Sequence, residues 1–283
     1  MQSEKEKQKF DQRVEFLKAK AREVRYHIVD MVYTAKSGHI GGSMSAADIM
    51  TALYFDILNI DPANPRWSER DRFILSKGHV CPVLYTCLAL KGYFPMDALK
   101  TLRQFGSILQ GHPIRKTPGV DVSSGSLGHG FGQGIGIALE AKYMKKDYSV
   151  FVVLGNGEIQ EGLVWEAAAA ADKYKLDNLV AIVDDNRMQN DGFTDSIMPM
   201  DPIDKKFEAF NWEVISIDGH DMHSVLATLE KAKAFKGKPV CIVANTIKGK
   251  GVGLMENQQR FHGKPPTEEE FEVALKEIRG EAE

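Results

Sequence analysis

One stretch, residues 148–192, limits the possible folds of this chain more than any other. It opens with an apolar, β-branched run, Val150–Leu154, which stops at a Gly-Asn-Gly turn. A helical pattern with a run of alanines follows, and a second apolar run, Leu179–Val183, stops at Asp-Asp-Asn. This order predicts a strand, a crossover helix and a parallel strand. We therefore expect an α/β fold, with a doubly wound, mostly parallel sheet and helices on both faces.

The turn after the first strand suits an anionic ligand. Gly155 and Gly157 let the backbone approach a ligand closely, and a helix starting after Gly157 would direct free N–H groups at a phosphate. Ligands of open parallel sheets bind beyond the carboxyl ends of the strands, where Asn156 and Asn186 lie. Their side-chain oxygens suit Mg²⁺ or Ca²⁺ better than zinc. A glycine turn without any ligand is the alternative for this turn taken alone.

Length and composition set the class of protein. A chain of 283 residues without an evident linker predicts one domain over residues 1–283, with a helical segment over about residues 1–60. A net charge of −3 gives no reason to expect nucleic acid. Without a long apolar stretch or a signal peptide's hydrophobic region, we expect no membrane contact and a cytoplasmic location. Cys81, Cys87 and Cys241 lack metal-ligand spacing and are interpreted as reduced core thiols.

Helical periodicity begins near the N-terminus and alternates with strands after the central stretch. Apolar residues recur at helical spacing from Phe10 to Thr34, and Ser45 is placed as the N-cap of a second helix. Later patterns predict helices over 203–210 and 222–235, strands over 212–217 and 239–246, and a capped amphipathic helix at the end.

Four histidines lie in loops beside glycines. They are His39 in SGHIGG, His79 in SKGH, His112 in GHP and His262 in HGKP. Residues 123–136 are rich in glycine, with spacings like the GxGxxG motif of dinucleotide-binding folds. We disfavour such a fold because no clear strand precedes the motif and no acidic residue closes a βαβ unit at the expected distance.

These motifs together resemble transketolase. GNGEIQEG followed by DDNR is similar to the thiamine diphosphate signature, a Gly-Asp-Gly with a later Asn, and SGH, SKGH and HGKP match histidine motifs of the family. The resemblance implies the thiamine-diphosphate-binding fold, thiamine diphosphate as cofactor and Mg²⁺, or Ca²⁺ or Mn²⁺, as its metal. It covers essentially the whole chain, but only the first half of a full-length enzyme.

The resemblance also implies the residues of a site. The metal ligands would be Asn156, Asn186 and the backbone carbonyl of Met188. The implied cofactor-binding residues are Gly125, Leu127, Gly155, Asn156, Gly157, Glu158, Asn186 and Lys248. The implied catalytic residues are His39, His79, His112, His262 and Glu161. Among these, His39 and His262 would handle substrate hydroxyl protons, His79 and His112 would orient the cofactor and the nascent oxyanion, and Glu161 would relay protons across a dimer.

Three positions depart from the family pattern or carry less weight. Asn156 stands where the family has Asp, so it keeps an oxygen ligand but removes one negative charge, and metal or cofactor affinity should fall. His129 replaces the usual Gln and is given no role. His220 resembles a family DGH turn, but a histidine at a helix entry can simply cap the helix.

The missing half of the family's enzyme implies a partner. We expect the chain to be the N-terminal subunit of a split transketolase that needs a separate C-terminal subunit carrying the pyrimidine-binding domain, in an α₂β₂ assembly. The reaction would be transfer of a two-carbon ketol unit from a ketose phosphate to an aldose, with the sugars left open. The alternatives are another thiamine diphosphate enzyme, a non-catalytic or regulatory subunit with a metal site weakened by Asn156 and, more distantly, a Rossmann oxidoreductase.

Overall fold

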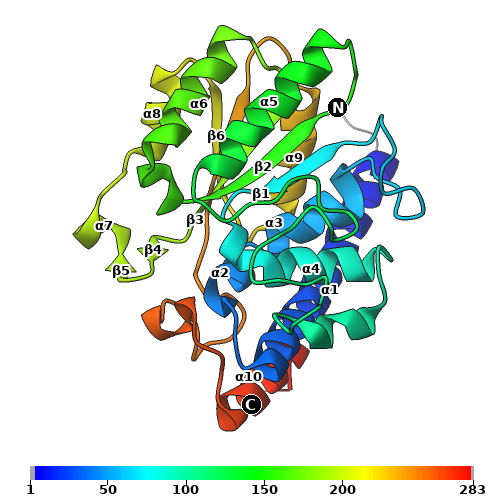
Figure 1. Cartoon of the computed structure of the whole chain (residues 1–283), viewed down its shortest axis with the longest axis vertical. Coiled ribbons are helices and arrows are strands. Elements are labelled where there is room, and N and C mark those ends of the chain that lie inside the picture. Colours follow the sequence, from blue (N-terminus) through cyan, green and yellow to red (C-terminus); the bar gives the residue numbers. More distant parts are fainter. Residues whose placement is uncertain (1–3, 282–283) are drawn as a thin grey trace.

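The computed structural model describes residues 4–281 and contains a central sheet of five parallel strands (Figure 1). In spatial order the strands are β1 (Arg72–Leu75), β2 (Val150–Gly155), β3 (Leu179–Asp185), β7 (Val240–Asn245) and β6 (Glu213–Asp218). The register aligns Leu75, Val153, Ile182 and Ile242 in one row across four strands. Such rows of branched apolar side chains are typical of a parallel sheet that is buried on both faces.

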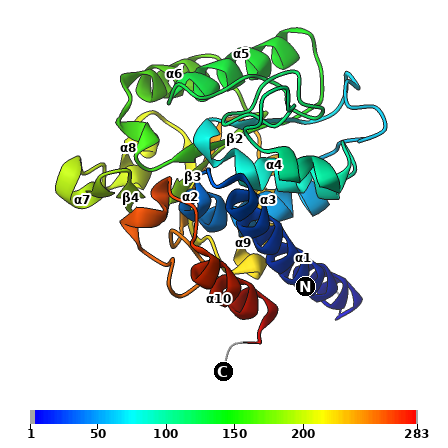
Figure 2. The same ribbon diagram turned by 60° about the horizontal axis from the view of Figure 1, so that its bottom comes forward.

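Helices cover both faces of the sheet, as the two views agree (Figures 1 and 2). One face carries α1 (Glu4–Ala35), α2 (Ile40–Ser45), α3 (Ala47–Ala52), α4 (Cys81–Leu90), α9 (Met222–Ala234) and α10 (Glu268–Arg279). The other carries α5 (His129–Tyr143), α6 (Gly162–Lys173) and α8 (Ile203–Ala209). The expected α/β fold, with a mostly parallel sheet between helical layers, is confirmed.

Alternation along each strand divides the core in two. In β2, Phe151 and Val153 join the core cluster beneath α1, whereas Val150, Val152 and Leu154 join the cluster beneath α5 and α6. Successive strand side chains point to opposite faces, so one continuous apolar run supplies both clusters. This double burial explains why the sequence shows no polar alternation in β2.

Helix ends in this fold are fixed by local chemistry. In α10 the hydroxyl of Thr267 accepts a hydrogen bond from the Glu270 amide at 3.3 Å, and the Glu270 carboxylate accepts one from the Thr267 amide at 2.8 Å. This capping box satisfies two N–H groups that the helix leaves free, and Gly280, with φ of 74°, ends the helix in a left-handed turn. The capped final helix was therefore predicted correctly.

Short elements connect the layers. They are η1 (Leu53–Ile57), η2 (Gly78–Val80), η3 (Met96–Thr101), η4 (Glu158–Gln160), η5 (Gln259–His262), the two-stranded β4 (Met188–Gln189) and β5 (Gly192–Phe193), and α7 (Thr194–Ile197). In Figure 1 the segment with β4, β5 and α7 projects to one side of the sheet, beyond the end of β3.

The prediction that Ser45 caps a helix is wrong. Helix α2 already begins at Ile40, and Ala46 rather than Ser45 precedes α3. The Ser45 hydroxyl instead donates to a carboxylate oxygen of Asp184 at 2.6 Å and to the Gly42 carbonyl at 3.0 Å. A buried carboxylate from a distant strand competes successfully for the hydroxyl that the local pattern assigned to a cap.

The three cysteines are free and buried, in agreement with their interpretation as core thiols. Burial raises the pKa of the Cys81 thiol to about 12 and those of Cys87 and Cys241 further, so the thiolate forms are disfavoured. Over residues 4–281, no helix has the combination of length and apolar character that crossing a bilayer requires.

Candidate active site

A cavity of about 260 Å³ lies where β1, β2, β3 and β7 end. Each strand is followed by a loop that contributes to the wall, as expected for an open parallel sheet. The lining residues are Gly42, Lys77, His79, Val80, Leu127, Gly155, Asn156, Gly157, Glu158, Gln160, Glu161, Asn186, Met188, Gln189, Asn190, Lys248 and His262. Eleven of the residues expected from the sequence therefore share one cavity.

Three of the four loop histidines form a cluster at this cavity. The ring centroids of His39 and His79 are 5.1 Å apart, those of His39 and His262 are 5.4 Å apart, and those of His79 and His262 are 5.5 Å apart. They come from the N-cap of α2, the turn η2 after β1, and η5 far along the chain. The fold thus brings together imidazoles that are separated by 40 to more than 200 positions.

Burial keeps these imidazoles neutral. It lowers the pKa of His39 to about 4, with help from the positive charges of Arg103, His112 and Lys248. It lowers the pKa of His262 to about 3, again with help from Lys248, and that of His79 well below its ordinary value. At neutral pH all three rings can accept a proton or a hydrogen bond, as a base for hydroxyl protons must.

Lys248 fixes the tautomer of His262. Its ammonium nitrogen lies 2.6 Å from Nδ1 of His262, and only 2% of the lysine is exposed. Because an ammonium can only donate, Nδ1 accepts and the ring proton sits on Nε2. Burial lowers the pKa of Lys248 to about 8, and the nearby ammonium of Lys77 adds to this effect. His262 therefore accepts a hydrogen bond from the buried ammonium group of Lys248.

The three expected metal ligands meet at the same cavity. Asn156 is 3% exposed, and its amide nitrogen donates to the hydroxyl of Thr194 at 3.3 Å. The Oδ1 atom of Asn156 takes no part in this hydrogen bond. Oδ1 of Asn186 accepts from the Met188 amide at 3.1 Å, and Nδ2 of Asn186 donates to the Ser45 hydroxyl at 3.1 Å. The side-chain nitrogens are thus turned toward protein partners.

This donor set fits a hard cation. The two Asn Oδ1 atoms and the Met188 carbonyl are oxygen ligands of the kind that Mg²⁺ and Ca²⁺ prefer. Among the described residues, no group of three or more His, Cys, Asp or Glu side chains is arranged to hold a metal ion. The ligands present are therefore neutral amide and peptide oxygens, and the missing charge at position 156 is not replaced by a carboxylate cluster.

The acidic residues at the end of β3 are already paired. Asp184 is fully buried and forms an ion pair with Lys77, and its carboxylate also accepts from the hydroxyls of Ser45 and Thr246 and from Nδ2 of Asn186 at 3.4 Å. These partners hold the pKa of Asp184 below its usual value despite the opposing effect of burial. Asp185 contacts the guanidinium of Arg187 at 3.1 Å, and burial raises its pKa to about 6. Lys77 was not predicted from its pattern, although it stands two residues before His79.

Glu158 fixes the turn after β2. Its carboxylate accepts from the Ser76 hydroxyl, from the Gly128 amide at 2.8 Å and from the Gly155 amide at 3.0 Å, and burial raises its pKa. It thereby ties together the ends of β1 and β2 and the start of α5. A cofactor contact of Glu158 stays a prediction, since these three bonds are all made within the protein.

The α-helix expected to start directly after Gly157 starts later. Residues 158–160 form a short 3₁₀ helix, Glu161 is extended with ψ of 130°, and α6 begins only at Gly162. The bond from the Gly155 amide back to Glu158 favours this separate turn over a continuous helix. Glu161 is instead the exposed N-cap residue of α6, at the edge of the cavity.

Of the expected residues Gly125, Leu127 and His112, only Leu127 lines the cavity. A Cβ on Gly125 would lie 3.2 Å from the His112 ring. Gly125 has φ of 156°, so a side chain would also be strained there. His112 is exposed and is not among the cavity-lining residues, but its backbone carbonyl is held by the Tyr85 hydroxyl at 2.9 Å.

Two histidines outside the cluster are accounted for differently. His220 bonds Asp48 through Nδ1 at 2.7 Å and accepts from the Ile247 amide through Nε2 at 2.8 Å. Because Ile247 precedes Lys248, His220 anchors the loop that carries the lysine and does not reach the cavity lining. His129 is exposed at the start of α5, away from the three-histidine cluster.

Comparisons with known proteins agree with this geometry. Residues 17–281 match the family model described as "Transketolase, thiamine diphosphate binding domain". One apulose-4-phosphate transketolase subunit, from Phocaeicola vulgatus, is 43% identical over 265 residues, which are 94% of each chain. The 6-deoxy-6-sulfo-D-fructose transketolase subunit of a Clostridium strain is 45% identical over 86% of this chain and 89% of its own length.

Longer relatives match over part of their length. Human transketolase is 40% identical over 94% of this chain but only 42% of its own length. The crystal structure of transketolase from Campylobacter jejuni superposes with a TM-score of 0.90 and 36% identity, covering 94% of this chain and 43% of the other. This chain therefore spans less than half of these single-chain relatives and nearly all of the subunits named above.

Proposed function

Because the chain belongs to the transketolase family, we propose that it is the thiamine-diphosphate-binding subunit of a two-chain transketolase. With a separate C-terminal subunit it would transfer a two-carbon ketol unit from a ketose to an aldose acceptor. The observation that carries this proposal is the cluster of three neutral histidines, backed by Lys248, at a cavity built from the ends of four parallel strands.

The cofactor site follows from the wall of the cavity. Asn156, Asn186 and the Met188 carbonyl would hold Mg²⁺ together with the diphosphate, and Gly155 and Gly157 would allow close approach of the backbone. When bound, thiamine diphosphate supplies the electron sink for the two-carbon fragment. Gly125, Leu127, Glu158 and Lys248 complete the proposed set, Glu158 by holding the turn in place.

The histidines would manage protons. His39 and His262 are neutral at pH 7 and can accept a proton from a substrate hydroxyl, and the Nε2–H of His262 can donate a hydrogen bond. His79 and His112 would orient the cofactor and a nascent oxyanion. The ammonium of Lys248 would keep His262 in the tautomer that presents Nε2.

The partner and sugars are part of the same proposal. Two relatives are named as one subunit of a transketolase, for apulose 4-phosphate and for 6-deoxy-6-sulfo-D-fructose. We infer a C-terminal partner with the pyrimidine-binding domain, an α₂β₂ assembly and a sugar phosphate or related acidic sugar as substrate. Glu161, exposed at the cavity edge, would then be available to face the equivalent site across the dimer.

Reconstitution tests the proposal. The chain would be mixed with the C-terminal transketolase subunit of its source organism, Mg²⁺ and thiamine diphosphate, and ketol transfer to an aldose would be followed. We expect turnover only in the mixture, and cofactor binding that EDTA abolishes. The proposal would be overturned if the mixture showed no ketol transfer and if neither this chain alone nor the mixture bound thiamine diphosphate.

The non-catalytic alternative receives no support from the relatives named above, all of which carry the name transketolase. The rings of His39, His79 and His262 also lie within 5.5 Å of one another at the cavity. Asn156 therefore remains a change in the charge of the metal site, and we do not propose it as a sign of lost activity.

A further inference from the structure

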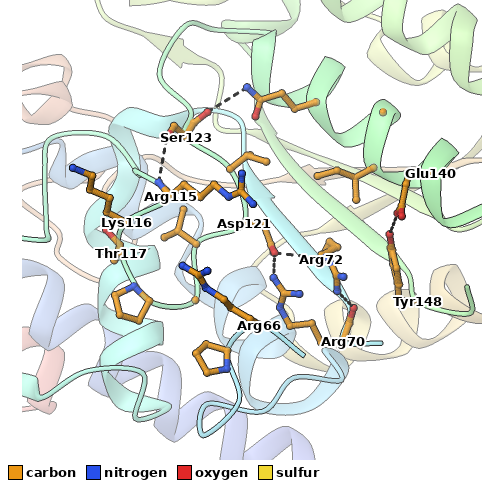
Figure 3. A pocket seen from close by; sticks show the side chains of 18 residues that line it. Arg66, Arg70, Arg72, Arg115, Lys116, Thr117, Asp121, Ser123, Glu140 and Tyr148 are labelled. Atoms are coloured by element: carbon orange, nitrogen blue, oxygen red, sulfur yellow. Dashed lines mark hydrogen bonds and ion pairs between the residues drawn. The ribbon is translucent and has the colours of Figure 1, made fainter. Parts of the chain in front are cut away.

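A second and larger hollow lies at the opposite ends of β1 and β2. Its volume is about 900 Å³, and its walls include Arg72 at the first position of β1 and Tyr148 just before β2 (Figure 3). The active-site cavity lies where these strands end. A strand of four residues is roughly 13 Å long, so the two hollows are separate sites.

The charge of this hollow is unbalanced. Five cationic side chains line it, Arg66, Arg70, Arg72, Arg115 and Lys116, against only two anionic ones, Asp121 and Glu140. The chain as a whole carries a net charge of −3, so the excess of positive charge is local. A concave surface lined by one sign of charge concentrates ligands of the opposite sign.

Two of the arginines are held by the protein. Arg70 forms an ion pair with Asp121 and donates to the Trp67 carbonyl at 3.0 Å. Arg72 donates to the Ser68 carbonyl at 2.8 Å, and its guanidinium lies 4.2 Å from the centre of the Tyr148 ring. Burial and the neighbouring charge of Arg70 lower the pKa of Arg72 from its ordinary value. The side chains of Arg70 and Arg72 are therefore held in place by these contacts.

The other three cations have no such partners. In the part of the chain that the structure describes, the side chains of Arg66, Arg115 and Lys116 make no hydrogen bond or ion pair, and all three are exposed. Figure 3 shows Arg66 and Arg115 reaching toward the middle of the hollow from different segments, with Lys116 at its margin. Two guanidinium groups aimed at one space are free to bind an oxyanion.

We propose that this arginine pocket, defined by Arg66, Arg70, Arg72, Arg115 and Asp121, binds a small molecule that carries a phosphate group. A guanidinium matches the oxygens of a phosphate with two parallel hydrogen bonds, and two unpaired ones suit its double charge. The volume lies in the range of small-molecule sites, and Pro118, Ile137 and Tyr148 give apolar walls for the remainder of the ligand. A sugar phosphate and a nucleotide share this chemistry.

The shape favours a small molecule over an acidic protein segment. The cationic groups come from a loop and the first residue of β1, residues 65–72, and from a second loop, residues 115–123, and they converge on a hollow whose far wall is α5. Gly136 on that wall has open space where a side chain would be, so the helix leaves room for a ligand. Arg66 and Arg115 are exposed, but their side chains reach into this hollow from two different segments (Figure 3).

Calorimetric titration of the full chain, saturated with Mg²⁺ and thiamine diphosphate, tests this proposal with three probes: inorganic phosphate, ribose 5-phosphate and AMP. We expect the double variant Arg66→Gln/Arg115→Gln to weaken binding of at least one probe by tenfold or more. The matched control is Arg22→Gln, which removes one exposed arginine of α1 outside the pocket and should change nothing. Preference for AMP or for ribose 5-phosphate identifies the source of the phosphate, and either supports the proposal.

A second variant distinguishes binding inside the pocket from general electrostatic attraction to the basic residues. Gly136→Leu adds a side chain inside the hollow without changing a charge, and leucine favours the helix. This variant should weaken the binding of AMP more than the binding of inorganic phosphate. Equal dissociation constants for wild type and the arginine variant would overturn the proposal. So would an arginine variant that keeps its affinity for every probe and loses only its affinity for the C-terminal partner, since the pocket would then belong to a protein interface.

Discussion

The two hollows of this molecule are both lined with basic residues, but the bases differ in kind. In the active-site cavity the basic groups are half-buried or buried His39, His79, His262 and Lys248, whose pKa values are all lowered by burial. In the arginine pocket they are guanidinium groups, exposed at Arg66 and Arg115 and half-buried at Arg70 and Arg72, which keep their charge at any ordinary pH. The comparison teaches that burial sets the protonation state of an imidazole or an ammonium, whereas a guanidinium attracts an anion whether it is exposed or half-buried.

The largest effect should follow the loss of a proton-handling ring. In the reconstituted enzyme, His262→Ala should lower kcat by roughly 10²- to 10⁴-fold, because a positioned general base contributes that much. Cofactor affinity should change little, since the ring faces the substrate in our proposal. The matched control is His223→Ala, which removes an exposed histidine outside the cavity. A loss of less than tenfold in a steady-state assay would remove His262 from the mechanism.

The next effect concerns charge at the metal. Asn156→Asp should tighten Mg²⁺-dependent binding of thiamine diphosphate on the order of tenfold, as a carboxylate replaces a neutral oxygen ligand. Titration by fluorescence quenching would measure it, with EDTA as the metal-free control and Asn156→Ala as the variant without an oxygen ligand. Equal affinity of wild type and Asn156→Asp would mean that the charge at this position is compensated elsewhere.

A smaller effect should appear in the alkaline limb of the pH profile. Lys248 loses its proton near pH 8, and its charge is one of the influences that keep the pKa of His262 low. The kcat of the wild type should therefore change by a few-fold as pH rises from about 7 to 9. Lys248→Gln keeps a donor to Nδ1 without the charge and should flatten this limb. An unchanged limb in the variant would assign it to another group.

Much of the fold was predictable because burial imposes a local pattern. Val150–Leu154 and Leu179–Val183 are apolar at every position, and only a doubly covered parallel strand explains such runs between turns. Once these strands are assigned, their ends must lie together, so Asn156 and Asn186 could be paired from the sequence. The histidines came from motif resemblance, since spacing alone does not bring His39 to His262.

The remainder depended on contacts between distant segments. Ser45 fits a local N-cap pattern, but Asp184, 139 positions away, takes its hydroxyl. The start of α6 was misplaced because Glu158 bonds back to the Gly155 amide. The arginine pocket was not predicted at all, because exposed loops have no periodicity and residues 65–72 meet 115–123 only in the folded chain.

The smallest expected effect is on stability at mildly acidic pH. The folded-state pKa values of about 4 for His39 and about 3 for His262 lie below the ordinary value of 6.5, so in this window the unfolded chain binds more protons than the folded one. The contribution of these rings to stability is complete above pH 6.5 and is lost as pH falls through about 4 for His39 and about 3 for His262. Thermal unfolding should show a decline in Tm of a few degrees over this range.

Two double variants test whether the fall in Tm with pH comes from the active-site cavity or from the arginine pocket. The Tm of the His39→Gln/His262→Gln variant should fall less than that of the wild type between pH 6.5 and 4.5. The reason is that a glutamine binds no proton in either the folded or the unfolded chain. Arg66→Gln/Arg115→Gln should keep the wild-type slope, since guanidinium groups do not titrate there. If the histidine variant instead kept the full slope, the acid sensitivity would belong to carboxylates such as Asp184, whose buried ion pair with Lys77 also opposes protonation.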